Sequence, residues 1–198
     1  MVRGDNDFET VVLALSRMSF LNLSEKLNLL KKLDSLYDLV VLSIEDISKI
    51  VGRVPKTEFK AETLVRQAQR DVLILKKLSI LWVCFLDDDY PPILKEISDP
   101  PFVLYYRGDF GILSRKSVSV VGTRKITGDS CRAAIDFAYD ACMDGINVIS
   151  GLAFGVDRKA HEGALNAYYD AQDKERVGKT IAVLPGGIDA VIPVCHKI

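Results

Sequence analysis

Small residues follow three short apolar runs in the second half of the chain, at points where a strand would turn into a helix. The runs end at Gly122-Thr123, Ser150-Gly151 and Gly186-Gly187. Glycine lets a ligand approach the main chain closely, and the helices that follow would turn their positive ends toward an anion. The three loops together predict one site for a phosphate group, although a glycine at such a turn can also serve the turn alone.

Basic side chains surround the first of these loops. Arg124 follows Gly122-Thr123 directly, and a guanidinium there could bind a phosphate through two hydrogen bonds or stack on a base. The other cations near the loops in sequence are Arg107, Arg115, Lys116, Lys125, Arg132, Arg158 and Lys159. Asp109 and Asp129 lie among them, and any single member could be a solvated surface charge. We interpret the set as a basic rim around the phosphate site.

Two titratable side chains follow the second loop. Asp157 and His161 are four residues apart and would share one turn of a helix. They could act as an acid–base pair, but side chains so placed more often hold a loop by hydrogen bonds, and no nucleophile accompanies them. Phe154 precedes them and could pack inward or present its ring to a nucleobase. No catalytic residue is predicted.

Spacing and composition exclude several common sites. The phosphate loop G-x-x-x-x-G-K-[ST] is absent, and no apolar run is followed by G-x-G-x-x-G. The four cysteines are scattered without the spacing of metal ligands, so we expect reduced thiols, no metal and no cofactor. The net charge of −1 provides no general basic field. A polyanion would therefore have to be held by a local patch.

Alternating strands and helices are expected to position the loops. The runs "SVSVVG", "INVISG" and "TIAVLPGG" are nearly continuous in apolar residues, and they alternate with helices expected over about 128–143 and 158–168. This pattern predicts parallel βαβ units. The expected fold class is α/β, with a Rossmann-like, mainly parallel sheet preceded by a small helical domain.

Residues 1–78 are predicted to form the helical domain and residues 79–198 the Rossmann-like domain. Apolar residues recur at helical spacing from Phe8 to Leu15. Ser24 is a predicted N-cap, and Ser43 with Asp46 predicts a capping box. No apolar run approaches the roughly 18 residues of a membrane span, and "MVRGDNDFET" does not resemble a secretory signal. We therefore expect a cytoplasmic protein without a membrane partner.

The glycine motifs resemble those of a known family. "SVVGTRKITGDS", "VISGLAFGVDRKAHEGAL" and "IAVLPGGIDAVIP" are similar, in the same order, to the central motifs of the DNA-processing protein A family (DprA, also called Smf). The likeness covers about residues 89–198, and the N-terminal part is similar in kind to that family's small sterile-alpha-motif-like domain. It implies an extended Rossmann fold that binds single-stranded DNA without catalysis and helps to load the RecA recombinase during natural transformation.

The resemblance also implies a set of DNA-binding residues. Arg124 matches the arginine of the family's DNA pocket, and Lys197 is expected to match a lysine that follows the third motif. "AFGVD" stands where the family has "ARGID", so Phe154 replaces an arginine. The predicted DNA-binding residues are Gly122, Thr123, Arg124, Lys125, Ser150, Gly151, Phe154, Gly155, Asp157, Gly186, Gly187 and Lys197.

Members of this family continue beyond the position of Ile198 with further strands and helices, which include a surface for self-association. The resemblance therefore implies a sheet that is incomplete on its C-terminal side and a homodimer in a full-length form. A sheet interrupted there would expose an edge and an apolar face. We expect lower stability or non-native association unless a partner covers them.

Two other functions stay open at this point. Pro185-Gly186-Gly187 is similar to a strand end in the cytokinin-activating phosphoribohydrolases, which suggests an enzyme that processes nucleoside phosphates. The catalytic glutamate of those enzymes is missing from the "IDAVIP" that follows. In the second alternative, the helical N-terminal region recruits a protein partner and the glycine loops bind nothing.

Overall fold

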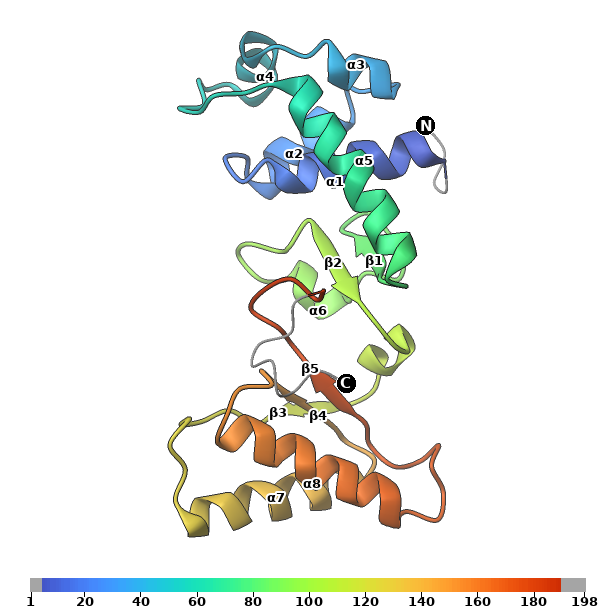
Figure 1. Ribbon diagram of the computed structural model, residues 1–198, viewed down its shortest axis with the longest axis vertical. Coiled ribbons are helices and arrows are strands. Elements are labelled where there is room, and N and C mark those ends of the chain that lie inside the picture. The colour runs from blue at the N-terminus through green and yellow to red at the C-terminus, as the bar shows by residue number, and fades with distance from the viewer. Residues whose placement is uncertain (1–4, 190–198) are drawn as a thin grey trace. The chain divides into compact units, whose positions relative to one another are not determined.

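The computed structural model describes residues 5–189. The chain forms two compact units, which divide between Arg107 and Gly108 (Figure 1). In the described residues, the first unit contains five helices followed by a pair of antiparallel strands with a sixth, short helix between them in sequence. The second contains a parallel sheet with two long helices. The α/β fold class predicted from the sequence is therefore confirmed.

Five helices build most of the first unit. They are α1 (Asn6–Arg17), α2 (Leu23–Leu30), α3 (Leu36–Val40), α4 (Ile44–Val51) and α5 (Ala61–Lys77). Helix α1 contributes an unbroken buried stretch from Thr10 to Leu15, which places it at the centre of this unit. Helix α5 packs against it through a stripe at helical spacing that includes Val65, Ala68 and Val72.

Capping boxes mark the start of three of these helices. The predicted capping box of Ser43 and Asp46 is confirmed at the start of α4. The prediction of Ser24 as an N-cap is wrong, because the side chain of Asn22 accepts a hydrogen bond from the Glu25 N–H at 2.9 Å. The Glu25 carboxylate in turn accepts one from the Asn22 N–H at 2.9 Å. This reciprocal pair moves the helix start upstream of Ser24.

A two-stranded antiparallel sheet completes the first unit. Strand β1 (Leu81–Cys84) pairs with β2 (Val103–Tyr106), and the short helix α6 (Pro92–Lys95) lies between them in sequence. The Tyr105 hydroxyl lies 3.4 Å from the Ser16 hydroxyl of α1. These strands therefore pack with the helices, and the predicted boundary near Ser79 falls inside the first unit, at the junction of α5 and β1. That boundary stays a prediction.

The end of α5 offers a test of backbone strain. Ser79 follows the helix with a φ of 51°, and it donates its N–H to Lys76 O while Ile80 donates to Leu75 O at 2.9 Å. This is the hydrogen-bond pattern of a Schellman motif, whose left-handed position favours glycine. We expect Ser79→Gly to raise the free energy of unfolding by about 0.5–1 kcal/mol. Urea denaturation will measure it, and a loss of stability would contradict this account of the helix end.

The second unit is built on a parallel sheet in the order β3-β4-β5. Its strands are β3 (Ser117–Ser119), β4 (Asn147–Ser150) and β5 (Thr180–Ala182), and the 3₁₀ helix η1 (Phe110–Ser114) precedes them. Helices α7 (Gly128–Met143) and α8 (Val156–Asp170) lie side by side on one face of the sheet (Figure 1). The buried core between helices and sheet includes Ala138, Val148 and Ala164. The predicted parallel βαβ units are thus confirmed.

Two of the cysteines are part of the cores. Cys84 and Cys142 are buried. Burial raises the pKa of the Cys142 thiol to about 11, which keeps it protonated near neutral pH. Within residues 5–189 no group of three or more His, Cys, Asp or Glu side chains is placed to hold a metal ion. No helix in the same range is both long and apolar enough to cross a bilayer.

Candidate nucleic-acid interface

The parallel sheet brings the loops that follow β3 and β4 into direct contact. The Val156 N–H donates to Thr123 O at 3.2 Å. Gly155 has a φ of 83°, and a Cβ atom built on it would lie 2.1 Å from Thr123 O and 2.7 Å from the Arg124 Cα. No side chain fits in that space. Gly155 is therefore required for the close approach of two loops that are about thirty residues apart in sequence.

A second glycine makes the same contact from the opposite side. A Cβ on Gly122 would lie 2.6 Å from the Val156 Cγ2, at the first residue of α8. The two loops therefore interlock, each with a glycine against the other. This geometry agrees with the prediction that the loops after Gly122-Thr123 and Ser150-Gly151 come together.

Ser150 joins the ends of all three strands. Its hydroxyl donates to Val120 O, just beyond β3, at 2.7 Å. Its carbonyl oxygen accepts a hydrogen bond from the Val183 N–H, just beyond β5, at 2.9 Å. Gly151 follows, and a Cβ there would lie 2.8 Å from a carboxylate oxygen of Asp157. A small polar residue and a glycine thus connect the strand ends without covering them.

The third loop is held less closely than the first two. Gly186 and Gly187 are both exposed. A Cβ on Gly186 would meet no atom within 4 Å, and one on Gly187 would meet only the side chain of Asp189. The structure therefore brings the β3 and β4 loops together, while the β5 loop continues past them. Lys197, the remaining predicted site residue, lies outside the described residues.

Arg124 is held through its main chain and leaves its side chain accessible. Its Cα lies against Gly155. Two hydrogen bonds between Thr123 and Lys125 close the turn around it. The Lys125 N–H donates to Thr123 Oγ1 at 3.1 Å, and the Thr123 hydroxyl donates to Lys125 O. Within residues 5–189 the Arg124 guanidinium has no ion pair or hydrogen bond, and both Arg124 and Lys125 are exposed. A fixed backbone and an unpaired guanidinium suit the capture of an anion.

The predicted basic rim is smaller than the sequence suggested. Arg158 is exposed in the first turn of α8, but Lys159 is bound by Glu162 at 2.6 Å, a hydrogen bond that raises the pKa of Lys159. Arg115 donates to Arg176 O at 2.9 Å and, with Lys116, precedes β3 at the opposite end of the strand from the glycine loops. Arg115 and Lys116 are close to Arg124 in sequence, but the length of β3 separates them from it in space.

Arg107 also leaves the predicted rim, because it belongs to the first unit. Its guanidinium donates to Leu78 O at the end of α5, at 3.0 Å. The exposed cations left around the β3 and β4 loops are Arg124, Lys125 and Arg158, with Arg132 on α7.

Asp157 and His161 have separate structural partners. Buried Asp157 accepts a hydrogen bond from the Ala153 N–H at 3.4 Å and so braces the loop that precedes α8. His161 Nδ1 and the Thr180 hydroxyl share a hydrogen bond of 2.6 Å, which ties α8 to β5. The loop-holding interpretation of this pair fits these contacts.

The loop after β4 contains one feature that sequence analysis missed. Leu152 has a φ of 58°, in the left-handed region that leucine rarely adopts. The residue type carries no signal for this conformation, because glycine or asparagine would be the usual choice. Phe154, two residues on, is 46% exposed rather than buried in a core. Gly155 then occupies the N-cap position of α8 without a side-chain hydrogen bond to the helix. Val156 donates its N–H to Thr123 O at 3.2 Å and Arg158 donates to Ala153 O at 3.1 Å, so two N–H groups of the first turn are used within the protein.

Comparisons with known proteins cover most of the chain. Residues 81–197 match the family model described as DNA recombination-mediator protein A. Protein Smf of Borreliella burgdorferi is 31% identical over 185 residues, which span 92% of this chain and 54% of that protein. DNA processing protein DprA of Streptococcus pneumoniae is 35% identical over 112 residues, which span 57% of this chain and 36% of that protein. The chain thus spans about half or less of the length of these relatives.

One solved structure matches nearly the whole chain. The X-ray structure of DNA processing protein A from Streptococcus pneumoniae superposes with a TM-score of 0.64 and 27% sequence identity. The match covers 99% of this chain and 63% of that chain. It supports the Rossmann-like assignment of the parallel sheet.

Proposed function

The chain belongs to the DNA recombination-mediator protein A family, and we propose that it binds single-stranded DNA through the interlocked loops after β3 and β4. The observation that carries this proposal is the packing of Gly155 against Thr123 and Arg124, which fixes the backbone of Arg124 while its guanidinium stays unpaired within the described residues.

Backbone phosphates are the groups that this arrangement suits. Arg124 would donate two hydrogen bonds to one phosphate, and Lys125 and Arg158 would add positive charge on either side. The N-terminus of α8 would contribute the field of its dipole, although Val156 and Arg158 already donate their N–H groups to Thr123 O and Ala153 O and the Asp157 carboxylate offsets part of that field. None of these groups reads a base edge, so we propose binding without base sequence preference. The Phe154 ring would stack on a neighbouring base.

We further propose that the protein acts without catalysis of its own. The separate partners of Asp157 and His161 support this, because neither side chain is arranged to move a proton for the other. Following the family resemblance, we propose that the bound strand is passed to the RecA recombinase during natural transformation and that a full-length form is a homodimer. Release of free base from nucleoside monophosphates would instead favour the phosphoribohydrolase alternative.

Arg124→Ala tests the proposed site. A hydrogen bond to a charged group contributes about 1.5–3 kcal/mol, so we expect affinity for labelled oligo-dT to fall by roughly 10- to 100-fold in fluorescence anisotropy. The slope of log affinity against log salt should also decrease in magnitude by about 0.7, because one phosphate contact with a single strand is lost.

Arg176→Ala is the matched control for this experiment. Arg176 is equally charged and belongs to the same unit, but it precedes β5 and so lies at the far end of the strand from the glycine loops. We expect its substitution to leave the affinity within about twofold of the unsubstituted protein, since its side chain lies away from the proposed phosphate contacts. If Arg124→Ala binds oligo-dT as tightly as this control, the site assignment is wrong.

A further inference from the structure

The last two turns of α5 have a second apolar face in addition to the one that packs against the core. Arg70, Leu73, Ile74, Lys77 and Leu78 stand at positions i, i+3, i+4, i+7 and i+8, which place them on one side of the helix. Val72 and Leu75, on the opposite side, are buried. We refer to these five residues as the α5 outer face.

The aliphatic members of the α5 outer face are strongly exposed. The exposed fraction is 69% for Leu73, 45% for Ile74 and 37% for Leu78. Single exposed leucines are common, but neighbouring ones on one helix face are a feature of interaction sites. The core does not need these side chains, because the buried stripe on the other side of α5 supplies its contacts.

The charges on this face are all positive. Within residues 5–189, neither Arg70 nor Lys77 has an ion pair or a side-chain hydrogen bond. The neighbouring charged side chains of α5 have partners on α1. Lys76 forms an ion pair with Glu9 at 3.0 Å, and the Asp71 carboxylate accepts a hydrogen bond from Arg17 at 2.7 Å. The α5 outer face therefore has two unneutralised cations and no carboxylate among its five residues.

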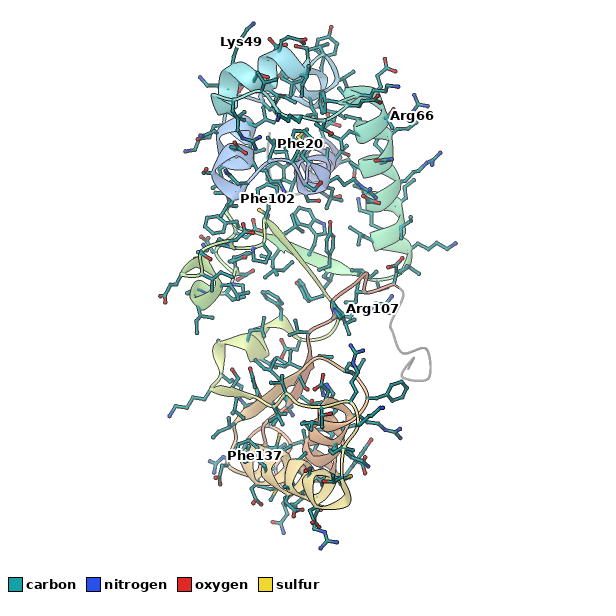
Figure 2. The ribbon with its side chains drawn as sticks, turned by 90° about the vertical axis from the view of Figure 1, so that its left-hand side faces the viewer. Phe20, Lys49, Arg66, Phe102, Arg107 and Phe137 are labelled. Atoms are coloured by element: carbon teal, nitrogen blue, oxygen red, sulfur yellow. The ribbon has the colours of Figure 1, made fainter. Side chains whose placement is uncertain are left out.

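A third cation extends this charge at the end of the helix. Arg107 donates to Leu78 O at 3.0 Å and is exposed. Figure 2 shows it where the first unit ends, and it shows Arg66, two turns before Leu73, pointing away from the other helices. A cation near the last carbonyl groups of a helix is favourable in itself, and this contact holds the Arg107 guanidinium at the C-terminal end of the α5 outer face.

We propose that the α5 outer face docks an amphipathic helix of another protein, one that has aliphatic side chains at helical spacing and Asp or Glu beside them. The aliphatic side chains of the two helices would pack together, and the partner's carboxylates would pair with Arg70, Lys77 and Arg107 at the rim. Nucleic acid is a poorer fit, since it would leave Leu73, Ile74 and Leu78 in water. A membrane is also a poorer fit, because the face spans only about 13 Å of helix and has no aromatic side chain.

Selection of peptides on the full chain tests this proposal. Phage-displayed random 16-residue peptides would be selected for binding to the immobilised protein. We expect the selected sequences to be enriched in Leu, Ile or Val at i, i+3 and i+7 and in Asp and Glu between them. A synthetic peptide of the selected sequence should bind Leu73→Asp and Lys77→Glu at least tenfold more weakly than the unsubstituted chain. A version of this peptide with lysine in place of its glutamates should in turn bind Lys77→Glu more tightly than it binds the unsubstituted chain.

Two control variants separate this surface from the DNA site. Arg124→Ala should bind the selected peptide normally, and Leu73→Asp should bind oligo-dT normally, so that either proposal can fail alone. Selected peptides that are basic, lack the helical spacing or bind Leu73→Asp and Lys77→Glu unchanged would overturn the proposal. The proposal would also be overturned if the chain bound phosphatidylglycerol vesicles, or formed a dimer, and Leu73→Asp abolished that binding or that dimer.

Discussion

Gly155→Ala is expected to weaken binding of single-stranded DNA by about 30-fold or more, a loss of at least about 2 kcal/mol. The backbone of Gly155 has a φ of 83° and a ψ of −128°, a combination that costs other residues about 1–3 kcal/mol. The new Cβ would also lie 2.1 Å from Thr123 O, so the two loops must move apart. Since the same contact fixes the backbone of Arg124, the proposed phosphate site would open. Anisotropy with labelled oligo-dT measures the loss.

Gly128→Ala provides the control for this prediction. Gly128 is the first residue of α7 in the same unit, and a Cβ there would meet no atom within 4 Å. The two variants carry the same chemical change, and they differ in the backbone conformation of the glycine and in its contact with the neighbouring loop. Circular dichroism should show that both retain the helices of the chain. Equal oligo-dT affinities for Gly155→Ala and Gly128→Ala would show that the interlocked loops do not form the DNA site.

Gly163→Ala is expected to destabilise the second unit by about 1–3 kcal/mol or more, because it overpacks the contact between α7 and α8. A Cβ on Gly163 would lie 2.2 Å from Ile135 O and 3.0 Å from the Ile135 Cα, both backbone atoms that cannot turn aside. Small buried residues such as Ala138, Ala160 and Ala164 keep these helices close along their length. Separating them would weaken several contacts at once.

The sign of this effect makes it a sharp test. Alanine is a better helix former than glycine by about 0.8–1 kcal/mol, so helix propensity alone predicts that Gly163→Ala stabilises the protein. Hydrogen exchange of the α7 and α8 amides, followed by mass spectrometry, should instead show faster exchange in this variant. Gly128→Ala should leave exchange in these helices unchanged or slower. Protection of α8 that increases in Gly163→Ala would contradict the packing argument.

Sequence patterns that depend on near neighbours in the chain predicted the structure well. The period of the apolar residues distinguished the helical N-terminal part from the strand-and-helix pattern that follows. The capping box of Ser43 and Asp46 is confirmed, since its four residues form their hydrogen bonds within one helical turn. The failure at Ser24 has a similarly local cause, because Asn22 offers a better-placed side chain two residues earlier.

Features of the candidate site that join distant segments could not be derived in this way. The sequence identified Gly155 as a loop glycine, but its contact with Thr123 O arises only when parallel strands bring two loops together. The direction of β3 removed Arg115 and Lys116 from the predicted basic rim. The left-handed conformation of Leu152 could not be predicted from its residue type.

The amino-acid sequence by itself thus determined the α/β class, the glycine-bearing strand ends and the membership of the DNA recombination-mediator protein A family. Only the tertiary structure decided which of these glycines are irreplaceable and which cations remain unpaired beside them. The physical reason is that propensity, capping and periodicity act between residues a few positions apart. Close backbone approach and ion pairing depend instead on distances in space, which the sheet and its helices create.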